Sequence, residues 1–175
     1  MGIVRDFIIN FGSLSSGEHE FNFEVKDSFF TRFEQSFIQR GDLDVLVVVE
    51  KKDNMLLLDI TIEGMVIVPC DRCLEDLELK IECFNELIVK VGSESVELSE
   101  NVIVISSKDH EIDVAQYIYE FITLMIPMRN VHDEVENGQK CDPEILKEIE
   151  KHVSHEEADA PTDPRWDILK NIKLN

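Results

Sequence analysis

Residues 55–83 read MLLLDITIEGMVIVPCDRCLEDLELKIEC, which is two alternating segments joined by a tight turn. Apolar and polar residues alternate from Leu56 to Ile62 and again from Leu77 to Cys83. This period of two predicts strands with one buried face, and the short connection predicts that they run antiparallel. Cys70 and Cys73 lie in the turn. We therefore expect a hairpin that carries two thiols at its tip.

The N-terminal part of the chain extends this pattern to a larger sheet. Strands are predicted at residues 3–10, 20–25 and 45–50, and the polar residues 51–54 predict a hairpin loop. Phenylalanines at helical spacing predict a helix over residues 28–40, with Gly41 as its left-handed C-terminal residue. Gly64 predicts a bulge in the strand that precedes the cysteines.

Beyond Cys83 the sequence predicts both strands and helices. Strands are predicted at residues 86–91 and 102–106, followed by a densely apolar helix over 114–126 that Asp113 opens and Pro127 ends. Acidic residues dominate after Val131, where Asp142-Pro143 and Asp163-Pro164 predict the starts of two short helices. The expected fold is α+β, with an antiparallel, partly closed β-sheet, two packed helices and an acidic helical C-terminal tail. We expect a core domain at 1–130 and an extension at 131–175.

A metal site is the strongest chemical signal. The C-x-x-C spacing of Cys70 and Cys73 lets two thiolates bind one ion, and a tetrahedral zinc needs two further ligands. His132 and Cys141 are the candidates for these. The four residues would form a Cys₃His site for structural zinc, and unmetallated thiols at a tight turn are the alternative.

Redox chemistry is the alternative use of a C-x-x-C pair. A redox C-x-x-C places its first cysteine at a helix N-terminus, whereas this turn leads into a strand. A thiol-dependent redox or metal-binding protein remains the alternative function. The alternation of residues assigns Cys83 to the buried face of its strand, as a core thiol. No catalytic motif or site for a small-molecule substrate is evident, so we expect no enzyme.

The charge of the chain bears on its partners. It carries 37 Asp and Glu against 17 Lys and Arg, a net charge of −20. Such a field repels nucleic acid and attracts basic proteins, although an acidic surface also serves solubility alone. No apolar run is long enough to span a bilayer, so we expect no membrane contact, a cytoplasmic location and reduced thiols.

These motifs together resemble the YceD family of large ribosomal RNA accumulation proteins. The resemblance rests on Cys70-Asp71-Arg72-Cys73-Leu74, on His132 with Asp133, on Cys141, and on the closing Asp163-Pro164-Arg165 with Leu169-Lys170. Many relatives carry a second cysteine cluster of the type G-L-C-x-x-C-G where this chain has residues 136–141 with one cysteine. This chain therefore resembles a divergent member.

The resemblance implies a cytoplasmic, non-enzymatic factor for accumulation or processing of the large-subunit (23S) ribosomal RNA. Its implied partners are the ribosomal RNA or a pre-ribosomal particle and a basic large-subunit ribosomal protein. The acidic surface would hold the protein partner. A local basic spot, at Lys51-Lys52 or at Lys170 with Lys173, is the alternative surface for direct contact with RNA.

Overall fold

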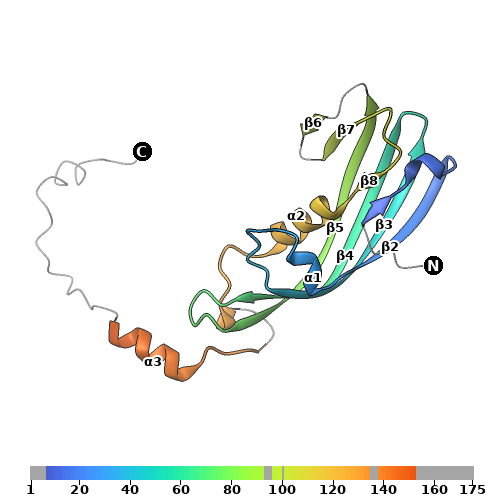
Figure 1. Cartoon of the computed structure of the whole chain (residues 1–175). Helices are drawn as coiled ribbons and strands as arrows, with labels where there is room; N and C mark the ends of the chain where they lie inside the picture. The colour runs from blue at the N-terminus through green and yellow to red at the C-terminus, as the bar shows by residue number, and fades with distance from the viewer. Residues whose placement is uncertain (1–6, 93–95, 100, 135–137, 153–175) are drawn as a thin grey trace, which may run out of the picture. The chain divides into compact units, whose positions relative to one another are not determined.

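The computed structural model describes residues 7–92, 96–99, 101–134 and 138–152, which form strands and helices of a mixed α+β protein (Figure 1). The chain divides into two compact units, Met1–Cys141 and Asp142–Asn175. The predicted domain boundary at residue 130 stays a prediction.

The first unit is built on a six-stranded sheet whose strand order is β2-β3-β4-β5-β7-β6. Neighbouring strands run antiparallel, except that β5 and β7 are parallel. The bounds of the strands are β2 Gly17–Val25, β3 Arg40–Lys52, β4 Met55–Pro69, β5 Asp76–Gly92, β6 Val96–Ser99 and β7 Val102–Ser106. A separate two-stranded sheet pairs β1 (Ile8–Ile9) with β8 (Ile112–Asp113).

The sheet is open, so the prediction of a partly closed sheet was wrong. In the described part of the chain, β2 and β6 are the two edges, and closure would require them to pair. On its β5 side, β7 pairs with only the last five residues of that strand, Ile88–Gly92, and β6, which pairs with the other side of β7, is shorter still. These short strands extend the sheet at one corner and do not bring it round to β2.

The hairpin that the sequence predicts is present and longer than expected. β3 and β4 meet at Lys52 and Met55, and β5 runs without interruption through the predicted separate strand at 86–91. Gly64 does not form a bulge, because the register of β3 and β4 passes through it unshifted. Glycine is required there for another reason: its φ is +153°, and a Cβ would lie 2.3 Å from the carbonyl oxygen of Asp42.

The predicted helix over 28–40 was wrong beyond its first turn. α1 covers only Asp27–Phe30, and the turns that follow make i→i−3 hydrogen bonds, such as Phe33 N to Phe30 O at 3.1 Å. The chain has to return at once to pair with the sheet, and Gln39 N already donates to Ile67 O at 3.0 Å. Gly41 lies in β3 instead of capping a helix, and a Cβ there would lie 2.6 Å from the ring of Phe30.

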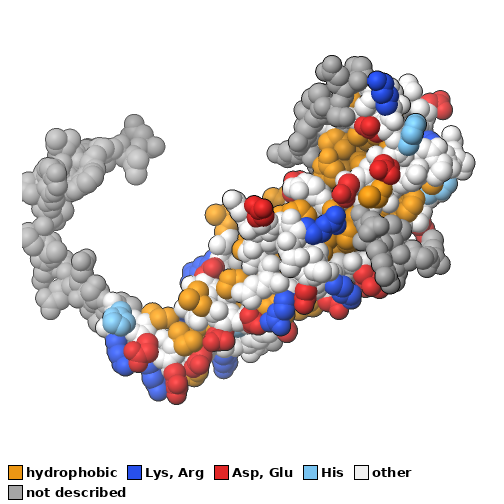
Figure 2. All heavy atoms as spheres, in the orientation of Figure 1, with side chains coloured by type: hydrophobic (Ala, Val, Ile, Leu, Met, Phe, Trp, Pro, Cys, Tyr) orange, Lys and Arg blue, Asp and Glu red, His pale blue; other side chains and the backbone are white. Residues whose placement is uncertain are grey.

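The second predicted helix is confirmed as α2, Ala115–Met125. Asp113 Oδ1 accepts a hydrogen bond from Ala115 N at 2.9 Å and so satisfies one of the free amides at its start. Its inner side is buried through Ile118, Phe121 and Ile122, while Leu124 is largely exposed. Hydrophobic side chains lie among acidic and basic ones on the face of the molecule drawn in Figure 2.

One face of the sheet holds the core. The alternating residues of β3, β4 and β5 on this face are buried, and α1 covers it through Phe29 and Phe30. An aromatic cluster continues from Phe7 and Phe29 through Phe33, whose ring stacks on Tyr119 of α2 at 3.9 Å between centroids. The ring contact therefore joins α2 to the turns that follow α1.

The second unit contributes one described helix, α3, over Pro143–His152. The Asp142-Pro143 signal is thereby confirmed, and Glu144 N donates to Asp142 Oδ1 at 2.8 Å. The predicted helix after Asp163-Pro164 lies outside the described residues. None of the helices in the described ranges combines the length and hydropathy that a membrane-spanning helix needs.

Candidate metal centre

The first half of the centre is the turn between β4 and β5. Cys70 N donates to Glu75 O and Leu74 N donates to Cys70 O, both at 2.9 Å, so the six residues from Cys70 to Glu75 close a compact loop. Leu74 adopts a left-handed conformation with a φ of 63°. This is the position after the second cysteine, where zinc knuckles usually have glycine.

The second half comes from the segment that follows α2. Asp71 N donates to Asn130 O at 2.7 Å, and Asn130 N donates to the Asp71 carboxylate at 2.6 Å. Arg72 adds an ion pair with Asp133 in the short 3-10 helix η2 (His132–Glu134), at 2.7 Å. These contacts hold the hairpin tip against a segment about sixty residues further along the chain.

Four ligand groups meet between the two halves. The ligand atoms of Cys70, Cys73, His132 and Cys141 all lie within 4.8 Å of one another, and all four residues are buried. Cys70 Sγ is 3.8 Å from Cys141 Sγ, and His132 Nδ1 is 3.3 Å from Cys73 Sγ and 3.7 Å from Cys141 Sγ. The structure therefore brings together all four residues that the sequence proposed as metal ligands.

These separations fit one tetrahedral zinc ion. Zn–S bonds of about 2.3 Å and a Zn–N bond of about 2.05 Å imply ligand separations of about 3.8 Å for two sulfurs and about 3.6 Å for sulfur and nitrogen. The three separations given above, 3.8, 3.3 and 3.7 Å, lie within a few tenths of an ångström of these values, and the remaining pairs lie within 4.8 Å. Three thiols and one imidazole also form a donor set that structural zinc sites use.

His132 is oriented by a second hydrogen bond. Its Nε2 lies 2.9 Å from the carbonyl oxygen of Asp76, which can only accept, so Nε2 carries the proton. In the neutral imidazole, Nδ1 is then unprotonated and faces the thiols. A hydrogen bond from the distal nitrogen to a carbonyl is the usual support of a metal-bound histidine.

The protein environment shifts the pKa values of the Cys70 and Cys141 thiols in opposite directions. Burial disfavours the thiolate of Cys70, but the backbone N–H groups of Cys73, Arg72 and His132 outweigh it and lower the pKa of this thiol to about 6. Burial raises the pKa of Cys141 to about 11, and the neighbouring thiols of Cys73 and Cys70 add to the shift. A bound divalent cation would favour the thiolate of both residues.

The burial of the thiols is unfavourable for a redox function based on thiol–disulfide exchange. Cys70, Cys73 and Cys141 are almost completely shielded from solvent, whereas redox-active cysteines are partly exposed. Cys83 lies on the inner face of β5, away from the cluster, and is half-buried rather than a full core residue. Burial raises the pKa of its thiol.

The other predicted motif residues divide into two groups. Arg72 and Asp133 form the ion pair described above, and Leu74 is exposed at the tip of the turn. Asp163, Pro164, Arg165, Lys170 and Lys173 lie outside the described residues. The basic spot at Lys51-Lys52 is occupied, because Lys51 Nζ donates to the carbonyls of Phe11 and Leu14 at 2.8 Å each, and Lys52 pairs with Glu50.

Two residues that support the metal centre could not be predicted from the sequence. Asn130 and Asp76 contribute mainly through their backbone groups, which no residue type signals. The position of Asn130, two residues before His132, is the single hint that it holds the same segment.

A hollow of about 590 Å³ lies on the sheet, and none of the four ligand residues lines it.

The chain matches the model of a known protein family. The family model described as "Large ribosomal RNA subunit accumulation protein YceD" matches residues 58–173, a range that includes all four candidate ligands. Searches of curated proteins and of solved structures found no significant match.

Proposed function

The chain belongs to the YceD family of large ribosomal RNA subunit accumulation proteins, and we propose that it supports accumulation or processing of the 23S ribosomal RNA without being an enzyme. The observation that carries this proposal is the family match over residues 58–173. In our proposal the protein acts in the cytoplasm, on pre-ribosomal particles.

The candidate metal centre has a structural part in this proposal. Cys70, Cys73, His132 and Cys141 would hold a zinc ion, and the ion would supply a cross-link between the hairpin tip and the segment after α2. The separations of Cys70 from Cys141 and of His132 from Cys73 and Cys141 support such an ion. All four ligand residues would be used, so no position is left open for a substrate, as is usual for a structural site.

The charge of the chain supports a protein partner. A net charge of −20 opposes binding to naked RNA, because binding there depends on releasing counterions from phosphates. The same charge accelerates encounter with a basic protein. We therefore propose that the chain reaches the large subunit through a basic ribosomal protein or a pre-ribosomal particle that presents one.

Depletion of the protein in its own host tests this function. The expected result is a lower ratio of 23S to 16S ribosomal RNA, restored by a plasmid copy of the wild-type chain. Affinity purification of the tagged chain should also recover large-subunit precursor particles. An unchanged ratio after depletion, together with no recovered particles, would refute the proposal.

A further inference from the structure

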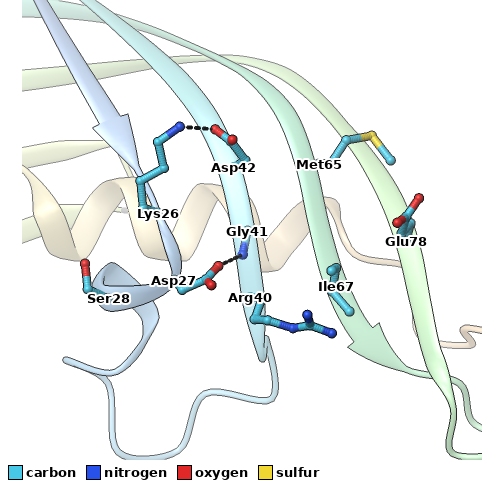
Figure 3. Close-up of a pocket in the computed structure, with 9 residues that line it drawn as sticks. All are labelled: Lys26, Asp27, Ser28, Arg40, Gly41, Asp42, Met65, Ile67 and Glu78. Carbon is cyan, nitrogen blue, oxygen red and sulfur yellow. Dashed lines mark hydrogen bonds and ion pairs between the residues drawn. The ribbon is translucent and has the colours of Figure 1, made fainter.

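The outer face of the sheet is the side opposite the core. α1 packs on the inner face, and among the described residues no helix covers the outer side chains of β2 to β5. Figure 3 shows part of this face, where Lys26, Asp42, Met65 and Glu78 follow one another across neighbouring strands. Such an uncovered face can serve as a binding surface if its side chains match a partner.

A row of carboxylates crosses this face. The strand register places Glu24 opposite Asp44, Asp44 opposite Glu63, and Glu63 opposite Glu82. Like charges directly opposite one another in a sheet are destabilising, so this arrangement does not serve the fold. We call these four residues the acidic row.

A second line of acids lies further along the same strands. Glu20 on β2, Asp59 on β4 and Glu86 on β5 share one level of the register, with Val48 between the first two. Between the two acidic levels lies a less polar level, which consists of Asn22, Leu46, Thr61 and Phe84. Phe84 is 59% exposed, although it is a large aromatic side chain.

The dimensions fit one polypeptide segment lying across the strands. The two acidic levels are four residues apart, which is about 13 Å along a strand. An α-helix with its side chains is about 10–12 Å wide. The surface is also hollowed between them, where a depression of about 400 Å³ is lined by Asn22, Glu24, Asp44, Leu46, Thr61 and Glu63.

Two lysines next to the row form ion pairs, Lys26 with Asp42 beside the row and Lys80 with Glu82 in it. The hydrogen bond with Asp42 raises the pKa of Lys26, and the charges of Glu24 and Asp44 add to this effect. The hydrogen bond with Glu82 raises the pKa of Lys80, with a smaller contribution from Glu63. Within the described ranges, the ion pairs include Glu82 but none involves Glu24, Asp44 or Glu63.

We propose that the outer face of β2 to β5 binds a lysine- or arginine-rich protein segment that lies across the strands. Its basic side chains would pair with the acidic row and with Glu20, Asp59 and Glu86, and its apolar side would cover Leu46 and Phe84. This inference rests on the proposed function, because it locates the surface for the basic partner.

Two matched variants of the full chain test the surface. The row variant is Glu24→Gln/Asp44→Asn/Glu63→Gln, and the control variant is Glu34→Gln/Asp53→Asn/Glu111→Gln, which changes the net charge equally at exposed positions elsewhere. The probe is a fluorescein-labelled, helix-forming peptide of lysine, leucine and alanine. The row variant should bind it about tenfold more weakly, and the control within about twofold of wild type.

Several results would overturn the proposal. These are no binding of the peptide by the wild-type chain, equal weakening by both variants, or an RNA hairpin that binds the wild type and loses affinity in the row variant. The row variant should fold normally, because it removes repulsion, and its melting temperature checks this.

Complementation of the depleted host separates this inference from the proposed function. Restoration of 23S RNA by the control variant and not by the row variant supports both. Full restoration by the row variant overturns the surface while the function stands. If depletion leaves 23S RNA unchanged and no precursor particles are recovered, the function fails, and the peptide measurement still decides the surface.

Discussion

Leu74 holds a left-handed backbone conformation at the position where a glycine would be free of strain. Such a conformation costs a leucine about 1–2 kcal/mol, and the exposed side chain gains little burial in return. Leu74→Gly should therefore leave the free energy of unfolding unchanged or raise it by up to about 1 kcal/mol. Leu124 is similarly exposed but lies in α2, where Leu124→Gly should cost about 1 kcal/mol. Urea denaturation of both variants measures the contrast, and a loss of stability in Leu74→Gly would contradict it.

The ligand residues give the second prediction at this scale. Zinc analysis of protein purified without chelator should give about one equivalent, and Cys73→Ser should abolish it, because the serine hydroxyl is a poor replacement for a thiolate. Cys83→Ala is the matched control and should retain the metal, since Cys83 lies outside the cluster. Equal zinc content in wild type and Cys73→Ser would reject the site.

Residue types carried most of the information about this centre. Cys70, Cys73, His132 and Cys141 were identified because thiols and imidazoles are recognisable ligands at any distance in the sequence. The carbonyl of Asp76 and the backbone of Asn130 could not be identified in this way, because every residue has these groups. Only the folded chain orients them toward the site. The ion pair of Arg72 with Asp133 likewise depends on the tertiary fold.

At the scale of elements, the strands were predictable and the first helix was not. Alternation identified β4 and β5 because one face of each is buried over its whole length. The spacing of four phenylalanines is that of the apolar side of a helix, but their segment is a short helix followed by turns. These residues are Phe29, Phe30, Phe33 and Phe37. Local spacing could not reveal that Gln39 is already paired with β4.

This correction has a measurable consequence. A continuous helix would place Phe30 and Phe37 on one buried side, whereas Phe30 is 2% exposed and Phe37 is 44% exposed. Phe30→Ala should cost about 3–5 kcal/mol, because it leaves a cavity against the sheet. Phe37→Ala should cost less than about 1 kcal/mol. Chemical denaturation of the two variants tests this, and similar losses would favour the continuous helix.

At the scale of the whole molecule, a bound metal would link distant parts of the first unit. The ligands at Cys70 and Cys73 are about sixty residues from His132, so an ion that binds all four closes a long loop and binds only the folded state. Removal of the metal with a strong zinc chelator should therefore lower the melting temperature. The shift should be absent in Cys73→Ser, and an equal shift in that variant would show that the chelator acts elsewhere.

The net charge of −20 leads to the last prediction, which concerns association. If the chain works through a basic ribosomal protein, the association rate should fall steeply as salt rises, because screening shortens the reach of exposed charges to about 10 Å at 0.1 M. Reversal of Glu144 and Glu150 in α3 to lysine should slow association further and, if anything, strengthen non-specific RNA binding.

Stopped-flow measurements at several salt concentrations give the association rates, and filter binding gives the affinity for RNA. Wild-type protein should bind naked RNA weakly at the ionic strength at which it binds the protein partner, because its charge opposes the release of counterions as a driving force. Tight RNA binding that is lost on changing Lys51 and Lys52, or Lys170 and Lys173, would favour direct RNA recognition instead. Because Lys51 Nζ already donates to two backbone carbonyls, it has less capacity left to bind a phosphate.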